Sequence, residues 1–286
     1  MRTLVQAWNE FWFRPQSTAT LALLRIVVGG LTVVWTLVLT SDFDTFFGPG
    51  GVAAGPRLVP LLAGLLLVAA ICLTIGFRTR LAAATVLGCF LVLYRVNPLI
   101  WNTGDTLLRH LVLFLALSPA GAALSLDSAR RGGGRQWEFP RRAPWALRLI
   151  QVQVALMYTV SFTSKLRGAT WRHGTAVSYV LRIAPDQRFA LPTAITSSVT
   201  WAHVLTWGTL AVEGAIPLLV WNRRTRPWVL AAGAALHLSI DLTLRTGFFT
   251  WIVLASYVAF VPPETAERIL LLRVRRQRDS GKTGRL

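Results

Sequence analysis

One residue in this chain combines rarity with a position that could support acid–base chemistry. Lys165 is one of only two lysines among 30 basic residues. Arginine stays charged under nearly all conditions, whereas lysine can lose its proton when water is excluded. Because Lys165 directly follows the apolar run 144–163, it lies where a predicted membrane span meets water. It is therefore a candidate general base, and the alternative is a lysine that only extends to the lipid headgroups.

Glu213, His237 and Asp241 also lie within apolar runs, where an uncompensated charge is costly. Glu213 falls near the middle of the run 201–221, so it must be protonated, paired or beside water. His237 and Asp241 are four residues apart, which places them on one helix face. A carboxylate one turn from an imidazole can fix the tautomer of the ring. The alternative is a polar contact between helices with no chemical role.

A further carboxylate and guanidinium lie one turn apart near the start of another apolar run, at Asp105 and Arg109. A helix N-cap formed by Asp105 would explain part of this pattern without any function. In the topology given below, these residues and the ones above lie at or just under the same outer membrane boundary. If the helices converge, one outward-facing cavity would be lined by Lys165, Asp105, Arg109, Glu213, His237, Asp241 and Arg245.

The hydropathy pattern predicts the elements that position these side chains. Of the 286 residues, 53% are hydrophobic and 15% are charged, and the mean hydropathy is +0.51. Because backbone groups must be paired within hydrocarbon, long apolar runs predict an all-α, polytopic transmembrane helical bundle. We expect about eight spans, each near the length that crosses ~30 Å of hydrocarbon. They lie at 20–40, 58–76, 80–96, 106–124, 144–163, 201–221, 227–244 and 247–262.

The basic residues predict the orientation of the bundle. Twenty of them fall in the N-terminus, in alternate connections and in the tail, and nine fall on the other side. This bias predicts that both termini are cytoplasmic. The predicted outer loop 164–200 departs from it, with five basic residues and one acid. That loop is either a solvated basic loop or a positive pocket for an anionic or quinone-like ligand.

Three regions follow from this map. Residues 1–17 are expected to form an interfacial segment, 18–262 the transmembrane domain, and 263–286 a basic cytoplasmic tail that is disordered after about 272. Residues 128–143 are expected to be a flexible basic linker. We expect a multi-pass protein of the bacterial plasma membrane, with the lipid bilayer as partner and no cleavable signal peptide.

The net charge of +18 does not indicate nucleic-acid binding, because the arginines cluster in loops that would face anionic headgroups. The two cysteines lie within apolar runs, and no metal-ligand spacing is present. We therefore expect neither a disulfide framework nor a metal site.

Several short motifs occur in a fixed order across residues 18–262. Asn102–Asp105 begins the fourth span, and Lys165 and Leu166 are followed by Trp171 and Gly174. The later motifs are Glu213 with Pro217, His237 with Leu238, and Gly247–Phe249. In this order the chain resembles a bacterial member of the HTTM (horizontally transferred transmembrane) domain family, the vitamin K-dependent gamma-carboxylase-like group.

The resemblance implies that Lys165 deprotonates vitamin K hydroquinone, which oxygen then oxidises, and that His237 assists and Trp171 lines the cavity. A quinone is accordingly the suspected cofactor. The chain ends soon after the last predicted span, so we expect it to lack the large extracytoplasmic domain of the carboxylases. Only one lysine stands where the carboxylases have a pair. Carboxylation of protein glutamate is therefore not expected even if quinone chemistry is retained.

Three functions stay open at this point. The first is quinol-dependent chemistry with Lys165 as the base. The second is a non-catalytic accessory role in the maturation or export of a toxin peptide, with an exported peptide as partner. The third is a transporter, which Glu213 and Arg25 inside spans favour and the absence of internal repeats disfavours.

Overall fold

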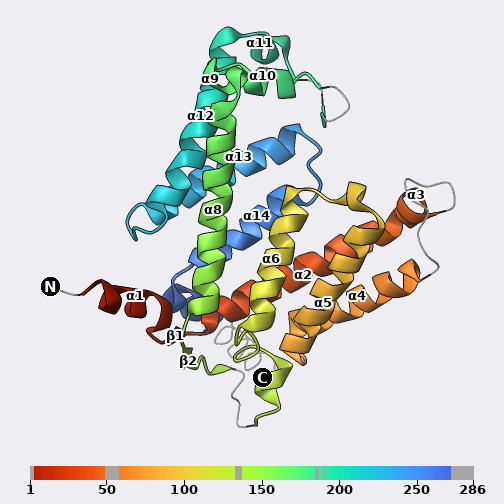
Figure 1. The fold of residues 1–286 in the computed structure, drawn as a ribbon, viewed down its shortest axis with the longest axis vertical. Coiled ribbons are helices and arrows are strands. Elements are labelled where there is room, and N and C mark those ends of the chain that lie inside the picture. Colours follow the sequence, from red (N-terminus) through yellow and green to blue (C-terminus); the bar gives the residue numbers. More distant parts are fainter. Residues whose placement is uncertain (1–2, 49–57, 133–136, 184–186, 190, 272–286) are drawn as a thin grey trace, which may run out of the picture. The chain divides into compact units, whose positions relative to one another are not determined.

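The structure is a computed structural model that describes residues 3–48, 58–132, 137–183, 187–189 and 191–271. Helices dominate it, and two strands of two residues each form its only sheet within these ranges (Figure 1). The expected all-α class is confirmed apart from this small sheet. The chain divides into two compact units, residues 1–150 with 255–286 and residues 151–254.

The first unit is built on four apolar helices that pack in sequence. Helix α2 (Ala19–Ser41) packs against α4 (Val59–Ile75), α4 against α5 (Thr79–Val96), and α5 against α6 (Thr103–Leu117). Its core contains fully buried Leu24, Leu66, Phe90, Leu108 and Leu111. The remaining elements of this unit are α1 (Leu4–Phe13), β1 (Gln16–Ser17), α3 (Phe43–Phe47), η1 (Pro98–Ile100), α7 (Leu126–Ala129), β2 (Arg141–Arg142), η4 (Val258–Phe260) and a helix over 263–271.

The close approach of α2 to α4 depends on a glycine. A Cβ atom at Gly29 would lie 2.6 Å from Oγ1 and 2.8 Å from the backbone nitrogen of Thr74. Small residues at such contacts let helices pack closely where lipid provides no hydrophobic driving force. Any larger residue at this position would push the two helices apart.

Helix α8 (Trp145–Arg167) begins in the first unit and continues into the second. In the second unit α12 (Val199–Leu219) packs against α13 (Arg226–Thr243) and against the short helices α10 (Ala176–Val180) and α11 (Thr193–Thr196). The unit also contains α9 (Ala169–Arg172) and most of α14 (Phe249–Tyr257).

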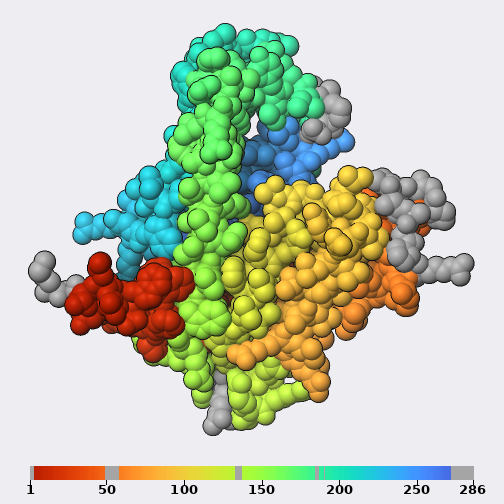
Figure 2. Space-filling view, viewed as in Figure 1, coloured from red at the N-terminus to blue at the C-terminus, as the bar shows by residue number. Residues whose placement is uncertain are grey.

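The apolar helices have the properties of a membrane protein. Among the described residues, α2, α5, α8 and α12 are long and apolar enough to cross a membrane, and Val59–Ile75 and Phe249–Phe260 are shorter apolar helices. Leu61 and Val68 on α4 are 70% and 59% exposed, and the surface of α4 and α5 (orange) is open to view in Figure 2. Apolar side chains on such a surface suit contact with lipid. A helix lies at each of the eight predicted spans, whereas eight crossings and cytoplasmic termini stay predictions.

Two boundary predictions are wrong for local reasons. Helix α6 ends at Leu117 and not at 124, because Ser118 precedes Pro119 and the proline ring disfavours helical backbone there. Residues 128–143 are not a simple flexible linker, since they begin within α7 and include β2, which pairs with β1. Residues 133–136 of that stretch, and the tail from 272, lie outside the described residues.

Arg25 of α2 does not extend to the headgroups, because its side chain is fully buried. Its Nη1 donates to the carbonyl oxygens of Ala120 at 3.1 Å and Ala123 at 3.3 Å, and its Nη2 donates to that of Leu124. These carbonyls belong to the non-helical turn that connects α6 to α7. Gly76 ends α4 with a positive φ of 71°, and a Cβ there would lie 2.5 Å from Nη1 of Arg25. Arg25 therefore holds the α6–α7 turn against α2 and the end of α4.

Asp127 of α7 holds the start of α5. Its Oδ1 accepts a hydrogen bond from the backbone nitrogen of Arg78 at 2.7 Å, and its Oδ2 accepts from the backbone nitrogen and Oγ1 of Thr79 at 2.8 and 2.7 Å. Burial by itself would raise the pKa of Asp127, but these hydrogen bonds and the nearby charge of Arg130 hold it below its usual value. A residue from another helix thus satisfies the free N–H groups at the start of α5.

Replacing Arg25 by methionine should destabilise the protein strongly. Arg25→Met leaves the buried carbonyls of the α6–α7 turn without a donor, which we expect to lower the free energy of unfolding by about 3 kcal/mol. Unfolding by denaturing detergent, followed by circular dichroism, measures this change. The control is Arg95→Gln at an exposed position of α5, which should change the value by less than about 0.5 kcal/mol. An equal effect of both variants would contradict the role of Arg25.

Replacing Asp127 by asparagine should destabilise the protein in a pH-dependent manner. Since the folded-state pKa is lowered, the carboxylate contributes stability at pH above about 4, the usual aspartate value, and this contribution is lost as the pH falls through the lower folded value. Asp127→Asn should therefore unfold at a lower temperature than the wild type at pH 7. The difference should shrink below about pH 4. Thermal unfolding across this range is the measurement, and a difference that does not depend on pH would refute the assignment.

Candidate functional site

The candidate site begins with three polar side chains on one face of α8. Tyr158, Ser161 and Lys165 are spaced by three and four residues, which aligns them along a single helix face. Tyr158 is buried, and Ser161 and Lys165 are partly exposed. Lys165 lies in the last turn of the helix, where a positive charge interacts favourably with the helix dipole. The sequence of α8 therefore presents a phenol, a hydroxyl and an ammonium group to its neighbours.

Lys165 forms an ion pair with Glu213 of α12. The Nζ atom of Lys165 lies 2.8 Å from Oε1 and 2.7 Å from Oε2 of Glu213. The Glu213 side chain is 8% exposed, and that of Lys165 is 23% exposed. A charge in apolar surroundings needs a partner, and here each group supplies the partner of the other.

Ser161 and Trp171 complete the surroundings of the ammonium group. Ser161 Oγ accepts a hydrogen bond from Lys165 at 2.6 Å and donates one to Glu213 Oε2 at 3.1 Å. The ring centroid of Trp171 in α9 lies 5.3 Å from Nζ, within the range of a cation–π contact. The ammonium group is thus held by a carboxylate, a hydroxyl and an aromatic face.

The approach of α12 to α8 at this level depends on a second glycine. A Cβ atom at Gly214 would lie 3.0 Å from the nearest ring carbon of Phe162 on α8. Pro217 lies within α12 four residues after Glu213, so it cannot donate to the carbonyl of Glu213. Both residues allow α12 to adapt to α8 around the ion pair.

A second pair lies between α8 and α13. Tyr158 Oη and His237 Nε2 are 2.6 Å apart, and both side chains are buried. The His237 backbone carbonyl accepts a hydrogen bond from Thr250 Oγ1 at 3.1 Å, and the ring of Phe249 lies 5.4 Å from the imidazole. His237 Nδ1 is buried and has no hydrogen-bond partner among the described residues. It is therefore a buried polar atom whose hydrogen-bonding capacity is not used within the described part of the chain.

The structure corrects the expected contact between His237 and Asp241. His237 is bound by Tyr158, and Asp241 forms an ion pair with Arg188, whose Nη2 lies 3.2 Å from Oδ1. Thr246 Oγ1 also donates to Oδ1 of Asp241, at 3.3 Å. Although the two residues are one helical turn apart, their side chains interact with different neighbours.

Asp105 and Arg109 belong to the first unit, where both have structural contacts. The N-cap of α6 is Asn102 and not Asp105. Asp105 is the N3 residue of a capping box, and its Oδ2 accepts a hydrogen bond from the Asn102 backbone nitrogen at 2.9 Å. Asp105 also accepts a hydrogen bond from Trp35 Nε1 at 2.9 Å. Arg109 lies over the rings of Tyr94 and Trp101, at 4.6 and 5.1 Å from their centroids. That these two residues share a cavity with Lys165 stays a prediction.

Three members of this arrangement, Tyr158, Ser161 and Arg188, were not predicted from the sequence. Ser161 and Tyr158 precede Lys165 by four and seven residues, a spacing that marks one helix face. That spacing could have indicated both residues. Arg188 carried no such signal, because it lies in the loop between α10 and α11, far from Asp241 in the sequence.

The comparison with known families places these residues in a defined domain. The model of the HTTM domain matches residues 52–264. The chain belongs to the HTTM domain family. Neither the comparison with curated proteins nor that with solved structures found a match. The matched range includes Lys165, Glu213, Tyr158 and His237, so both pairs lie within the family domain.

The Lys165–Glu213 pair should show strong energetic coupling in a double-mutant cycle. Lys165→Met and Glu213→Gln should each destabilise the protein, because each leaves a charge without its partner. The double variant should be more stable than the sum of the two effects predicts, with a coupling of about 1–3 kcal/mol from reversible unfolding in detergent. The matched control is Arg188→Gln with Asp241→Asn, a pair whose arginine is 44% exposed. Its coupling should stay below about 1 kcal/mol, and an additive cycle for the first pair would refute its role.

Proposed function

We propose that this HTTM-family membrane protein transfers a proton from a quinol-type substrate, with the Lys165–Glu213 pair as the base. The observation that carries the proposal is an ammonium–carboxylate pair at 2.7 Å whose carboxylate is nearly buried and whose lysine keeps a partly exposed side chain. In such a pair the carboxylate is shielded from water, while the lysine side chain remains accessible to a substrate. The likeness to vitamin K-dependent gamma-carboxylases supplies the substrate class.

The ion pair changes which group finally receives the proton. In the arrangement described, Lys165 is an ammonium group and has no free electron pair with which to act as a base. Lys165 can accept a proton from a quinol hydroxyl group only as it passes one of its own protons to Glu213. The pair then gains one proton in total, the substrate becomes an anion, and Lys165 remains the cation that stabilises it. This refines the expectation of a lone lysine base into a two-residue relay.

The donor and acceptor groups of the site suit a quinol. A hydroquinone presents hydroxyl groups on a planar apolar ring. Tyr158 holds the ring of His237 in place, and the buried Nδ1 of that ring would bind a quinol hydroxyl group only in a conformation that exposes it. Trp171 offers an aromatic face beside Lys165 for contact with the planar ring. A quinol would reach these groups from the bilayer, where such apolar molecules dissolve.

The rival is a non-catalytic accessory role, in which the protein assists an exported peptide. One observation favours it: Ser161 and Glu213 satisfy the hydrogen bonding of the Lys165 ammonium group, as in a purely structural ion pair. The transporter alternative loses one of its two supports, since Arg25 is bound to backbone carbonyls of the α6–α7 turn. We therefore retain the accessory role as the second candidate.

The decisive test compares lysine variants in membranes that contain the full chain. Lys165→Ala, Lys165→Arg and Glu213→Gln should each reduce the oxidation of added vitamin K hydroquinone in air by roughly 100-fold or more, the usual range for loss of a general base. Arginine keeps the positive charge but cannot give up a proton to Glu213, so Lys165→Arg distinguishes a residue that transfers protons from one that only forms an ion pair. Product formation is measured by mass spectrometry.

The control is Lys282→Arg, which changes the only other lysine and should leave the rate unchanged. Mass spectrometry of quinones that copurify with the protein provides a readout independent of turnover. Full activity of Lys165→Arg would overturn the proton-transfer proposal. Retained peptide export by the same variant, with no bound quinone, would establish the accessory role.

A further inference from the structure

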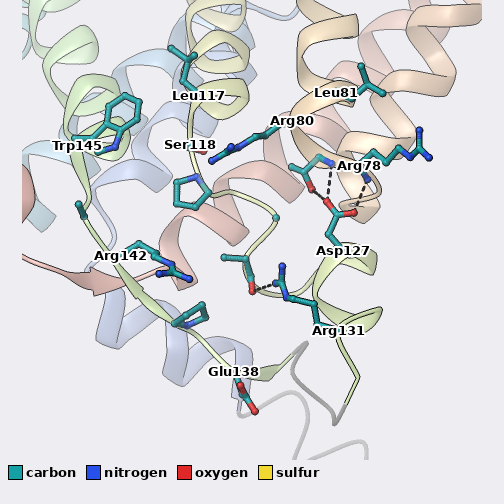
Figure 3. A pocket seen from close by; sticks show the side chains of 16 residues that line it. Arg78, Arg80, Leu81, Leu117, Ser118, Asp127, Arg131, Glu138, Arg142 and Trp145 are labelled. Carbon is teal, nitrogen blue, oxygen red and sulfur yellow. Dashed lines mark hydrogen bonds between the residues drawn. The ribbon is translucent and has the colours of Figure 1, made fainter.

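A pocket of about 1110 Å³ lies in the first unit, where α5 and α8 begin and α6 ends (Figure 3). Its walls come from the start of α5, the turn after α6, the end of α7, strand β2 and the start of α8. The basic loops that the charge bias assigns to the cytoplasm surround it. The pocket contains neither of the polar pairs described above.

Guanidinium groups dominate the polar part of the pocket. Figure 3 shows Arg80 of α5, Arg131 after α7 and Arg142 of β2 pointing toward the middle of the pocket. The side chains of Arg80 and Arg142 are exposed and make no hydrogen bond within the described part of the chain. Arg131 uses Nη2 for the carbonyl oxygen of Ala122 at 3.0 Å and keeps its other donors. Three separate elements therefore direct available N–H donors to one place.

The two carboxylates of the pocket offset only part of this charge, because four arginines line it. Asp127 is occupied by the N–H groups of Arg78 and Thr79 at the start of α5. Glu138 is exposed, and it is the only other acid among the lining residues. The pocket thus has an excess of positive charge and suits an anion that can accept several hydrogen bonds. Guanidinium groups bind phosphate oxygens in this way, often two at a time.

The border of the pocket is apolar. Leu81 and Leu117 line it and are 59% and 50% exposed, and Trp145 lines it on the side of α8. A small soluble anion would gain nothing from exposed leucines. An anionic phospholipid has both a phosphate for the arginines and acyl chains for the leucines. Tryptophan is also typical of the boundary between headgroups and hydrocarbon.

We propose that this pocket binds the phosphate headgroup of an anionic phospholipid, with Arg80, Arg131 and Arg142 as its ligands. Basic pockets among transmembrane helices on the cytoplasmic side commonly bind such headgroups. One bound phosphate would connect α5, the segment after α7 and β2. Binding should therefore stabilise the first unit as well as recruit the lipid.

The test uses the full chain purified in detergent and titrated with phosphatidylglycerol. Native mass spectrometry should show a saturable bound lipid, and the thermal unfolding midpoint should rise with it. Arg80→Gln/Arg142→Gln should weaken the apparent affinity by roughly 25-fold, because one basic residue near a surface contributes about fivefold. Arg80→Lys/Arg142→Lys keeps both charges and should retain most of the binding, which also shows that the positions tolerate substitution.

The matched control is Arg223→Gln/Arg224→Gln, which removes two exposed charges from another basic connection. It should leave the affinity within about twofold, as expected for charges outside the pocket. An equal loss in the control would reduce the effect to general surface attraction and overturn the proposal. Unchanged binding by Arg80→Gln/Arg142→Gln would overturn it as well. A third outcome is that inorganic phosphate raises the thermal unfolding midpoint as much as phosphatidylglycerol does, while phosphatidylcholine does not raise it. The ligand would then be a soluble anion and not a lipid.

Discussion

The arrangement of the second unit depends on one constraint: a charge in apolar surroundings must have a partner. Lys165 and Glu213 satisfy it for each other, and Ser161 connects them. The same ion pair limits the chemistry, because the ammonium group cannot act as a base until a proton has moved to the carboxylate. Stability and function are therefore set by the same contact.

The first unit satisfies the same constraint in another way. Buried Arg25 is matched by backbone carbonyls of the α6–α7 turn instead of by a carboxylate. Asp127 is matched by backbone N–H groups at the start of α5. In both cases the partner is a polar backbone group that is not paired within a helix, in the turn after α6 for Arg25 and in the first turn of α5 for Asp127. The non-helical turn after Leu117, which hydropathy did not predict, is what makes these two contacts possible.

Family membership and site geometry support different parts of the functional conclusion. The HTTM domain covers residues 52–264 and establishes the class of membrane protein. The contacts of Lys165 and His237 define which atoms can exchange protons or bind a ligand. Quinol chemistry joins the two and is the proposed function. The arginine pocket of the first unit is independent of it, since it rests on charge and on an apolar border.

The limits of prediction are visible in individual residues. Hydropathy located a helix at all eight predicted spans, since long apolar runs need internally paired backbone. It placed the end of α6 too late, because the effect of Pro119 is local and hydropathy does not include it. Spacing along α8 could have aligned Tyr158 and Ser161 with Lys165 on one face, although only Lys165 was named from the sequence.

What the sequence by itself determined was the helical class, the membrane character and the identity of the costly charges, because these depend on residue type and periodicity along one helix. Only the tertiary structure decided their partners. Asp241 was one turn from His237 yet pairs with Arg188, and Glu213 could have been protonated, solvated or paired. Partner choice depends on how separate helices rotate and approach, at contacts such as that of Gly214 with Phe162. A pattern confined to one helix carries no information about that approach.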